Sequence, residues 1–214
     1  MREILLIRHG ETDWNAERRL QGHLDIGLNT AGRRQARALA RALRAEKLDT
    51  IIASDLQRAL HTAQAIAAEQ DATVQIEPGL RERCYGAFEG LRHADIQQRY
   101  PHDYAAWQAR EFDARFPQGE RAAETLREFT ERAVGAVTRL AAAGKARRVA
   151  IVTHGGVLEC VYRAVNGVAA GAPRDFEIRN AGINRMLWDG TGLRMQQWSD
   201  TAHLSAAALD EVDR

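Results

Sequence analysis

Apolar residues follow two alternating patterns along the chain. Short runs in which nearly every position is apolar predict buried strands, at residues 4–7, 50–53, 73–76 and 149–152. Between them, apolar residues recur every three or four positions, which predicts amphipathic helices in segments 30–43, 56–66 and 126–140. Strands that alternate with helices form mainly parallel sheets covered by helices. We therefore predict an α/β fold, a three-layer α/β/α sandwich with a mostly parallel central sheet.

The ends of these elements carry local signals. Thr30 and Ser54 precede helical patterns, and we expect them to cap these helices, because a hydroxyl oxygen can accept a backbone N–H at a helix start. Near the end of the chain, apolar runs at residues 183–188 and 194–198 flank a turn at residues 190–192, which reads Gly-Thr-Gly. This arrangement predicts a β-hairpin.

The segment from about 92 to 117 breaks the alternation. It mixes aromatic residues, arginines and prolines, which predicts an irregular insertion of short helices that closes over the sheet as a cap. Its aromatic residues could shape an apolar pocket or form a small core of the cap itself. They are Tyr100, Tyr104, Trp107, Phe112 and Phe116. A length of 214 residues fits a single domain, 1–214, that contains this insertion.

Composition and charge exclude several classes of function. The chain has 30 Lys and Arg against 29 Asp and Glu, a net charge of +1 that favours neither nucleic acid nor an anionic membrane. No apolar run approaches the roughly 18–20 residues of a membrane-spanning helix. The apolar run near the N-terminus is too short for a signal peptide. Cys84 and Cys160 have neither disulfide nor metal spacing, so we expect free thiols and a cytoplasmic location.

Two of the predicted strands lead directly into a histidine. Arg8 and His9 follow the run at 4–7, and His154 follows the run at 149–152 after one intervening residue. In open parallel sheets, ligands bind just beyond the carboxyl ends of the strands. Two parallel strands would bring both imidazoles to the same edge of the sheet, so the sequence predicts a site there.

An arginine and a carboxyl group are candidates for the same site. Arg58 lies in the first turn of the helix that follows residues 50–53, where free N–H groups and the helix dipole already favour an anion. Its guanidinium adds a planar fork suited to phosphate or carboxylate. Glu82 could serve as a general acid beside these groups. The residues alone do not choose Glu82 over Glu89.

Together these residue types indicate phosphoryl transfer. Two arginines and two histidines around one point would neutralise an anion of about two charges, as the transition state of that reaction requires. A neutral imidazole is a competent nucleophile towards phosphorus. A carboxylic acid can protonate the leaving alkoxide and later take a proton from water. No Cys, His or carboxylate cluster has metal-ligand spacing, so we expect metal-free chemistry.

The order and spacing of these motifs resemble the histidine phosphatase superfamily, the phosphoglycerate-mutase-like proteins. The matching stretches are residues 8–12, 14–15, 21–22, 28–32, 54–59, 80–86 and 153–156. The tail, residues 203–211, looks like that of short bacterial members labelled probable phosphoglycerate mutase, a branch that includes broad-specificity phosphatases. The resemblance covers nearly the whole chain and implies the phosphoglycerate-mutase-like fold.

The resemblance also implies roles for individual residues. His9 would be the nucleophile that becomes phosphohistidine, and Glu82 would be the proton donor and then the base. The residues implied to bind the phosphoryl group or its substrate are Arg8, Asn15, Gln21, Gly22, Arg58, His154 and Gly155. No metal ion is implied. Relatives form edge-strand dimers, so the resemblance allows a homodimer.

Members of this superfamily pass the phosphoryl group either to water or back to a phosphoglycerate. Three positions depart from the mutase pattern: His93 replaces a lysine, Trp107 is not followed by two arginines, and His23 stands where mutases have tryptophan. Arg110 and Arg115 could partly compensate. We therefore expect a phosphatase of small phosphorylated metabolites, without a cofactor. The alternative is a phosphoglycerate mutase that uses 2,3-bisphosphoglycerate. A less favoured third is an inactive module that binds phosphorylated ligands.

Overall fold

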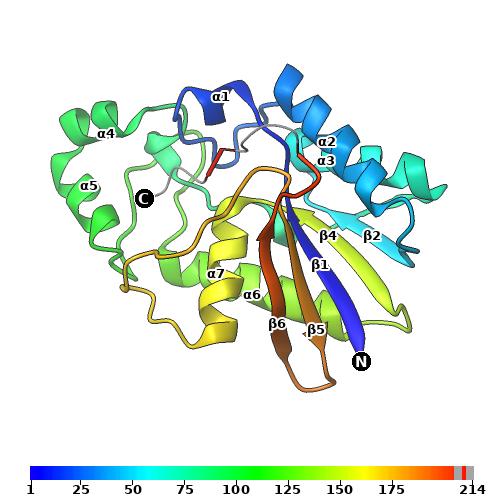
Figure 1. The fold of residues 1–214 in the computed structure, drawn as a ribbon. Coiled ribbons are helices and arrows are strands. Elements are labelled where there is room, and N and C mark those ends of the chain that lie inside the picture. The colour runs from blue at the N-terminus through cyan, green and yellow to red at the C-terminus, as the bar shows by residue number, and fades with distance from the viewer. Residues whose placement is uncertain (205–208, 211–214) are drawn as a thin grey trace.

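The computed structural model describes residues 1–204 and 209–210, and its centre is a six-stranded sheet (Figure 1). In chain order the strands are β1 (Arg2–Arg8), β2 (Thr50–Ala53), β3 (Val74–Ile76), β4 (Arg148–Thr153), β5 (Ile183–Trp188) and β6 (Leu193–Asp200). Their order across the sheet is β3-β2-β4-β1-β5-β6. The first four pair in parallel, whereas β5 pairs antiparallel with both β1 and β6. The mostly parallel sheet and the hairpin are confirmed.

Helices occupy the connections between strands. The α-helices are α1 (Asp13–Ala16), α2 (Thr30–Leu43), α3 (Gln57–Gln70), α4 (His93–Arg99), α5 (Pro101–Gln108), α6 (Leu126–Ala142) and α7 (Gly155–Asn166). Two short 3₁₀ helices, η1 (Pro78–Leu80) and η2 (Gly86–Phe88), lie in the long connection after β3. The three predicted helices correspond to α2, α3 and α6.

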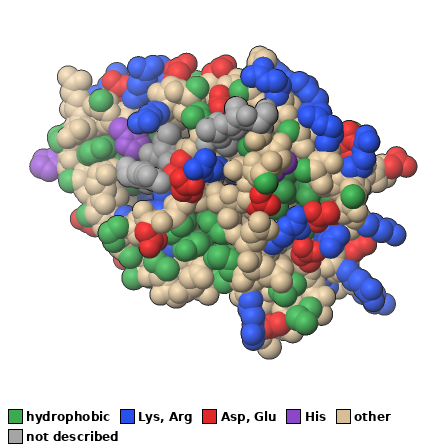
Figure 2. All heavy atoms as spheres, in the orientation of Figure 1, with side chains coloured by type: hydrophobic (Ala, Val, Ile, Leu, Met, Phe, Trp, Pro, Cys, Tyr) green, Lys and Arg blue, Asp and Glu red, His purple; other side chains and the backbone are tan. Residues whose placement is uncertain are grey.

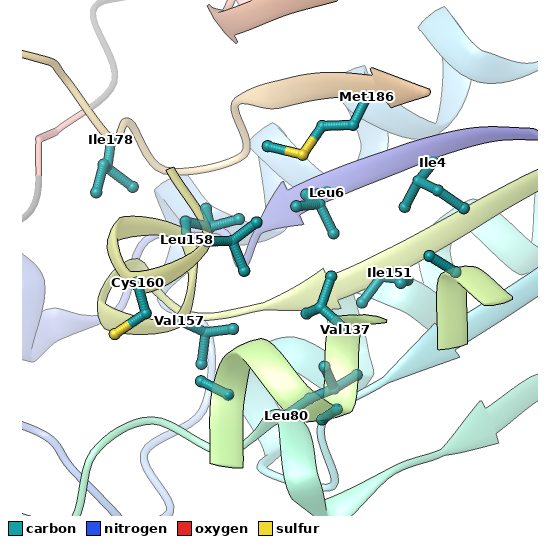
Figure 3. Close-up of a cluster of buried hydrophobic side chains, with 14 of the residues drawn as sticks. Ile4, Leu6, Leu80, Val137, Ile151, Val157, Leu158, Cys160, Ile178 and Met186 are labelled. Atoms are coloured by element: carbon teal, nitrogen blue, oxygen red, sulfur yellow. The ribbon is translucent and has the colours of Figure 1, made fainter. Parts of the chain in front are cut away.

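Side chains of β1 alternate between the two faces of the sheet. Ile4 and Leu6 pack into a core with α6 and α7, where Figure 3 shows them beside Val137 and Leu158. Leu5 belongs to a second core, formed with α2 and α3 on the opposite face. Because both faces are covered, the middle of the strand, residues 4–7, is apolar at every position. The predicted three-layer sandwich is confirmed.

The strand ends that carry the site meet at one edge of the sheet. β1 and β4 are neighbours, and Arg8 at the end of β1 pairs in register with Thr153 at the end of β4. The residue that follows each of these two strands is a histidine. The parallel register therefore places His9 and His154 side by side, as the sequence predicts.

The segment 92–117 contains α4 and α5, which pack around a separate small core. Its buried members are Leu20, Tyr85, Phe88, Ile96, Trp107, Phe116 and Ala123, with Tyr100 and Tyr104 packed against them. Four of the five aromatic residues singled out above thus help to form a local core. Phe112 instead packs against the large core of α6 and α7. Both open interpretations hold in part, because Trp107 and Phe116 also line a pocket described below.

Two predicted helix caps are wrong. The cap of α2 is Asn29, whose side chain accepts the backbone N–H of Gly32 at 2.8 Å, and Thr30 is the first helical residue. Ser54 does not cap α3, because the helix begins only at Gln57 and the residue before it is Leu56, which has extended φ and ψ. The Ser54 hydroxyl is used elsewhere, as shown below.

The surface carries charges of both signs. Figure 2 shows Lys, Arg, Asp and Glu side chains interspersed over one face of the molecule. Cys84 and Cys160 are free and buried, and burial raises the pKa of the Cys160 thiol to about 12. None of the helices in the described residues combines the length and apolarity needed to cross a membrane. Of the tail at 203–211, residues 205–208 and 211 lie outside the described residues.

Candidate active site

His9 follows β1 directly and is 3% exposed. Its Nδ1 lies 2.7 Å from the carbonyl oxygen of Gly10. A carbonyl can only accept a hydrogen bond, so Nδ1 carries the proton and Nε2 of the neutral ring has a free lone pair. Burial, together with the positive charges of Arg58 and Arg8, holds the pKa of His9 well below its ordinary value. The ring is therefore neutral at pH 7.

The end of β1 is held by a segment distant in sequence, residues 178–181. Arg8 is fully buried, and its Nη1 donates to the carbonyl of Ile178 at 2.7 Å. Asn180 Nδ2 donates to the carbonyl of His9 at 3.0 Å. The backbone N–H of Ala181 donates to the carbonyl of Arg8 at 3.1 Å, and Ala181 adopts a left-handed φ of 55° to do so. These contacts fix the position of the first two candidate residues.

Arg58 is the second residue of α3 and is 1% exposed. Its Nη2 donates to the carbonyl of Gly22 at 2.7 Å, and its Nη1 donates to the carbonyl of Leu24 at 2.9 Å. Gly22 has a φ of +52°, and a Cβ there would lie 2.0 Å from a carboxylate oxygen of Glu89. A glycine is thus needed for the loop to bring its carbonyl to Arg58.

His154 lies behind Arg58 and is fully buried. Its Nδ1 accepts from Nε of Arg58 at 3.2 Å, and its Nε2 lies 2.9 Å from the hydroxyl of Ser54. The rings of His154 and His9 meet edge to face, with centroids 5.2 Å apart. Burial, then the charge of Arg58, lowers the pKa of His154 well below its ordinary value. Both ring nitrogens of His154 have protein partners in this structure. That His154 contacts a phosphoryl group directly stays a prediction.

Glu82 reaches the same edge of the sheet from the connection after η1. Its Oε1 accepts the N–H of Arg83 at 2.8 Å, and its Oε2 accepts the N–H of Gly156 at 3.0 Å. A Cβ on Gly156 would lie 2.2 Å from Oε1, so only glycine allows this approach. Glu89 points elsewhere, because its carboxylate accepts the backbone N–H groups of His23 and Tyr85.

Asn15 and Gln21 are oriented by one hydroxyl, that of Thr12. The amide oxygen of Asn15 lies 3.0 Å from the N–H of Thr12 and 3.0 Å from its hydroxyl. The amide oxygen of Gln21 lies 2.9 Å from the same hydroxyl. The single hydroxyl hydrogen of Thr12 can be donated to only one of these two oxygens at a time. Because the oxygen of Asn15 also accepts the backbone N–H of Thr12, the NH₂ group of Asn15 is left to donate to a ligand.

These side chains surround one cleft, which we name the strand-end pocket. Its lining residues are Arg8, His9, Asn15, Arg19, Leu20, Gln21, Gly22, Arg58, Glu82 and Tyr85. Seven of the nine residues assigned to the site from sequence are among them. His154 and Gly155 are not among the described lining residues. The sequence did not predict three further lining residues, Arg19, Leu20 and Tyr85.

The arrangement combines a neutral imidazole with a free lone pair, two buried guanidinium groups and a carboxyl group. The sequence profile described as the histidine phosphatase superfamily (branch 1) matches residues 4–201. The chain belongs to this family. Its members are phosphatases and mutases, so the protein is an enzyme of the phosphatase and mutase class.

Some relatives of the chain are named as mutases and others as phosphatases. The chain is 36% identical over 223 aligned residues to a probable phosphoglycerate mutase, GpmB, of Cronobacter sakazakii, with all of both chains covered. It is 34% identical to the metal-independent phosphoserine phosphatase of Arabidopsis thaliana, covering 97% of this chain and 85% of the relative. A mycobacterial glucosyl-3-phosphoglycerate phosphatase solved with VO3 superposes with a TM-score of 0.80 at 28% identity, covering 94% and 100% of the two chains.

Beside the strand-end pocket lies a second cleft, which we name the cap pocket. It is lined by Arg83, Tyr85, Trp107, Arg110, Glu111, Phe116, Leu126, Phe129, Gly156, Glu159 and Cys160. Tyr85 lines both clefts, and Glu82 contacts Gly156 between them. The cap pocket is therefore where the remainder of a ligand would lie if its phosphoryl group occupied the strand-end pocket.

Two of the charged side chains that line the cap pocket, Arg110 and Glu159, are paired with each other. Glu159 is buried on α7, and Nη2 of Arg110 lies 2.8 Å from its carboxylate. Arg163, one turn further along α7, contacts the same oxygen at 2.8 Å. Arg110 also donates to the carbonyl of Ala170. This network joins the end of α5 to α7.

Several functional contacts carry no local sequence signal. His23 Nε2 donates to the backbone carbonyl of Glu82 at 2.8 Å, and Arg132 donates to the same oxygen at 3.0 Å. Thr62 accepts the backbone N–H of Gly10 at 3.0 Å. Among the residues that the structure describes, no group of three or more His, Cys, Asp or Glu side chains is arranged to hold a metal ion.

Proposed function

We propose that the protein is a metal-free phosphatase of small phosphomonoesters that works through a phosphohistidine at His9. The observation that carries the proposal is the Nδ1–H of His9 donating to Gly10. It leaves the Nε2 lone pair of a neutral, buried ring in a pocket lined by Arg8 and Arg58. These two guanidinium groups are suited to stabilise the charge that spreads over the phosphoryl oxygens.

The reaction would proceed in two displacements at phosphorus. In the first, the Nε2 lone pair of His9 forms the P–N bond while the ester P–O bond breaks, and Glu82 gives its proton to the leaving oxygen. In the second, Glu82 takes a proton from water, the hydroxide forms a P–O bond, and the P–N bond breaks. Inorganic phosphate leaves and His9 is restored. Asn15 and Gln21 would donate their NH₂ groups to phosphoryl oxygens.

Two of the relatives named above support the substrate class. One is named for phosphoserine and the other for glucosyl-3-phosphoglycerate, and both are phosphatases of small phosphorylated metabolites. The first is also named metal-independent. We therefore propose a small phosphorylated metabolite as the substrate and no resident cofactor.

The contacts of Arg110 and Arg115 favour a phosphatase over a mutase. A mutase must hold the carboxylate of its phosphoglycerate while the phosphoryl group returns. Arg110 is already paired with Glu159, and Arg115 donates to the carbonyl of Ala123 and to Glu128, half-exposed and away from both pockets. His93 packs against Trp107, with ring centroids 4.8 Å apart and ring planes tilted by 44°. The full-length match to a probable phosphoglycerate mutase keeps that activity as the second candidate, with 2,3-bisphosphoglycerate as its cofactor.

One assay separates the candidates. The protein is incubated with 3-phosphoglycerate, with and without 2,3-bisphosphoglycerate, while free phosphate and 2-phosphoglycerate are followed together. Phosphate release without isomerisation supports the proposal, and release should be unchanged in EDTA. Fast isomerisation with little free phosphate would establish the mutase. If neither product forms, O-phosphoserine, glucose phosphates and p-nitrophenyl phosphate are tested next, and no phosphate release from any of them would overturn the proposal.

A further inference from the structure

We propose that Ser54 is a positioning residue for Arg58, acting through the imidazole of His154. Ser54 follows β2, Arg58 lies in the first turn of α3, and His154 follows β4. They form a single chain of hydrogen bonds, 2.9 Å from Ser54 to His154 and 3.2 Å from His154 to Arg58. Only the last member lines the strand-end pocket.

The direction of each hydrogen bond follows from the groups at the two ends. Nε of a guanidinium can only donate, so Nδ1 of His154 must present its lone pair to Arg58. A neutral imidazole has one N–H, which is then on Nε2. The hydroxyl oxygen of Ser54 accepts it, and a second lone pair of this oxygen accepts the N–H of Leu56 at 3.3 Å.

Burial makes this choice of tautomer matter. Ser54 and His154 are fully buried and Arg58 is 1% exposed, so water does not readily replace a lost partner. In the other tautomer, Nδ1–H of His154 would face Nε–H of Arg58, two donors with no acceptor between them. An unsatisfied buried donor is costly. Ser54 thus stabilises the one tautomer that supports Arg58.

The consequence for Arg58 is a fixed guanidinium plane. Its Nη2 and Nη1 donate to the carbonyls of Gly22 and Leu24, on one side of the group. The bond from Nε to His154 holds it on another side. Small errors in the placement of a group that stabilises the transition state cost large factors in rate. We therefore expect Ser54 to affect phosphoryl binding without touching the ligand.

The test replaces Ser54 with alanine and with threonine. In Ser54→Ala, Nε2–H of His154 loses its acceptor, so we expect roughly tenfold weaker binding of orthovanadate and a similar loss in kcat/KM. Nitrogen-15 NMR of the histidine rings should show His154 as the Nε2–H tautomer in the native protein and as a mixture in Ser54→Ala. Ser54→Thr keeps the hydroxyl and should restore both readouts.

A double-mutant cycle asks whether the effect passes through Arg58. Arg58→Lys keeps the positive charge and removes Nε, so in that background Ser54→Ala should weaken orthovanadate binding by less than twofold. Thr130→Val is the matched control. It removes a partly buried hydroxyl that contacts Cys160 and should leave the tautomer of His154 and the binding of orthovanadate unchanged.

Two results would overturn the inference. One is a His154 that keeps the Nε2–H tautomer in Ser54→Ala with native orthovanadate affinity. The other is a Ser54→Ala effect that stays fully tenfold in the Arg58→Lys background. The inference uses the proposed function only for its effect on rate, because tautomer and orthovanadate binding are measured without turnover. Failure of the phosphatase proposal is thus distinguishable from failure of this one.

Discussion

The two adjoining pockets are built on different principles. In the strand-end pocket, Arg8, His9 and Arg58 are buried, and each is hydrogen-bonded to backbone carbonyls that come from the ends of strands or the loops beside them. In the cap pocket, aromatic rings form the walls, and the charges of Arg110 and Glu159 are satisfied by each other. The strand-end pocket is lined by buried cationic groups, whereas the cap pocket combines aromatic rings with a paired Arg110 and Glu159.

This difference assigns separate tasks to the two pockets. Groups fixed by the sheet suit a chemical step that is the same for every phosphomonoester, since preorganised charge stabilises the transition state. Part of the wall of the cap pocket comes from segment 92–117, whose residues can change without moving the strand ends, which suits selection of the leaving group. Perturbing the strand-end pocket should change the rate for all substrates, and perturbing the cap pocket should change the preference among them.

The largest expected effect is that of His9→Ala. Both displacements pass through this side chain, so we expect activity to fall by at least about 10⁴-fold for every ester. Phosphate release is measured together with acid-labile label on the protein after incubation with a ³²P-labelled substrate. His61→Ala, which removes an exposed imidazole on α3, is the control and should retain both signals. A His9→Ala protein that still turns over normally would remove the nucleophile from the strand-end pocket.

Glu82→Gln should show the next largest effect, and one that depends on the leaving group. We expect a loss of about 10²–10³-fold for alkyl esters, whose alkoxide needs a proton. The loss should be much smaller for p-nitrophenyl phosphate, whose leaving group is stable as an anion. The ratio of the two kcat/KM values is the measurement. Equal losses would move the acid elsewhere, and Glu89→Gln would then be tested for the same dependence.

The pH dependence of the free energy of unfolding tests the two buried histidines at this edge of the sheet, His9 and His154. Because the pKa values of His9 and His154 are lowered in the folded protein, the unfolded chain binds more protons below pH 6.5. Their contribution is fully present above pH 6.5 and is lost as pH falls towards the folded pKa. Each ring that stays neutral should cost about 1.4 kcal/mol at pH 5.5. Urea unfolding at pH 7.5 and 5.5 measures the loss, which should be smaller in His154→Asn.

Arg110→Gln should have the smallest effect and one confined to the cap pocket. It frees the carboxylate of Glu159 from one of its two partners, so the order of preference among esters should shift by less than about tenfold. Inhibition by orthovanadate should stay unchanged. Arg115→Gln, which removes a guanidinium of the same segment that lines neither pocket, is the control. Weaker orthovanadate inhibition in Arg110→Gln alone would mean that the two pockets are not separate.

The sequence predicts the strand-end pocket well because its signals are local. An apolar run that ends in a histidine shows both the strand and the side chain at its end, and parallel pairing then brings His9 and His154 together. The same holds for Arg58, which follows β2 within a few residues. Sequence patterns did not locate the start of α3 correctly, since nothing in residues 54–56 shows that Leu56, and not Ser54, directly precedes the helix.

The remaining contacts depend on tertiary structure. Asn180 and Ala181 support His9 from 171 and 172 positions away, and no periodicity or capping signal marks them. The pairing of Arg110 with Glu159 likewise joins two elements whose packing the sequence does not specify. The residues alone left Glu82 and Glu89 open, and the resemblance chose Glu82. The structure adds the backbone N–H partners of each carboxylate, which no sequence pattern shows.

The position of β1 in the middle of the sheet has a consequence for motion. β1 has two strands beyond its partner β4 and one beyond its partner β5, so its amides are protected by neighbours on both sides (Figure 1). Such amides exchange with solvent deuterium mainly through global unfolding, whereas peripheral elements open locally. β1, which leads directly into His9, is thus expected to keep its geometry through every turnover.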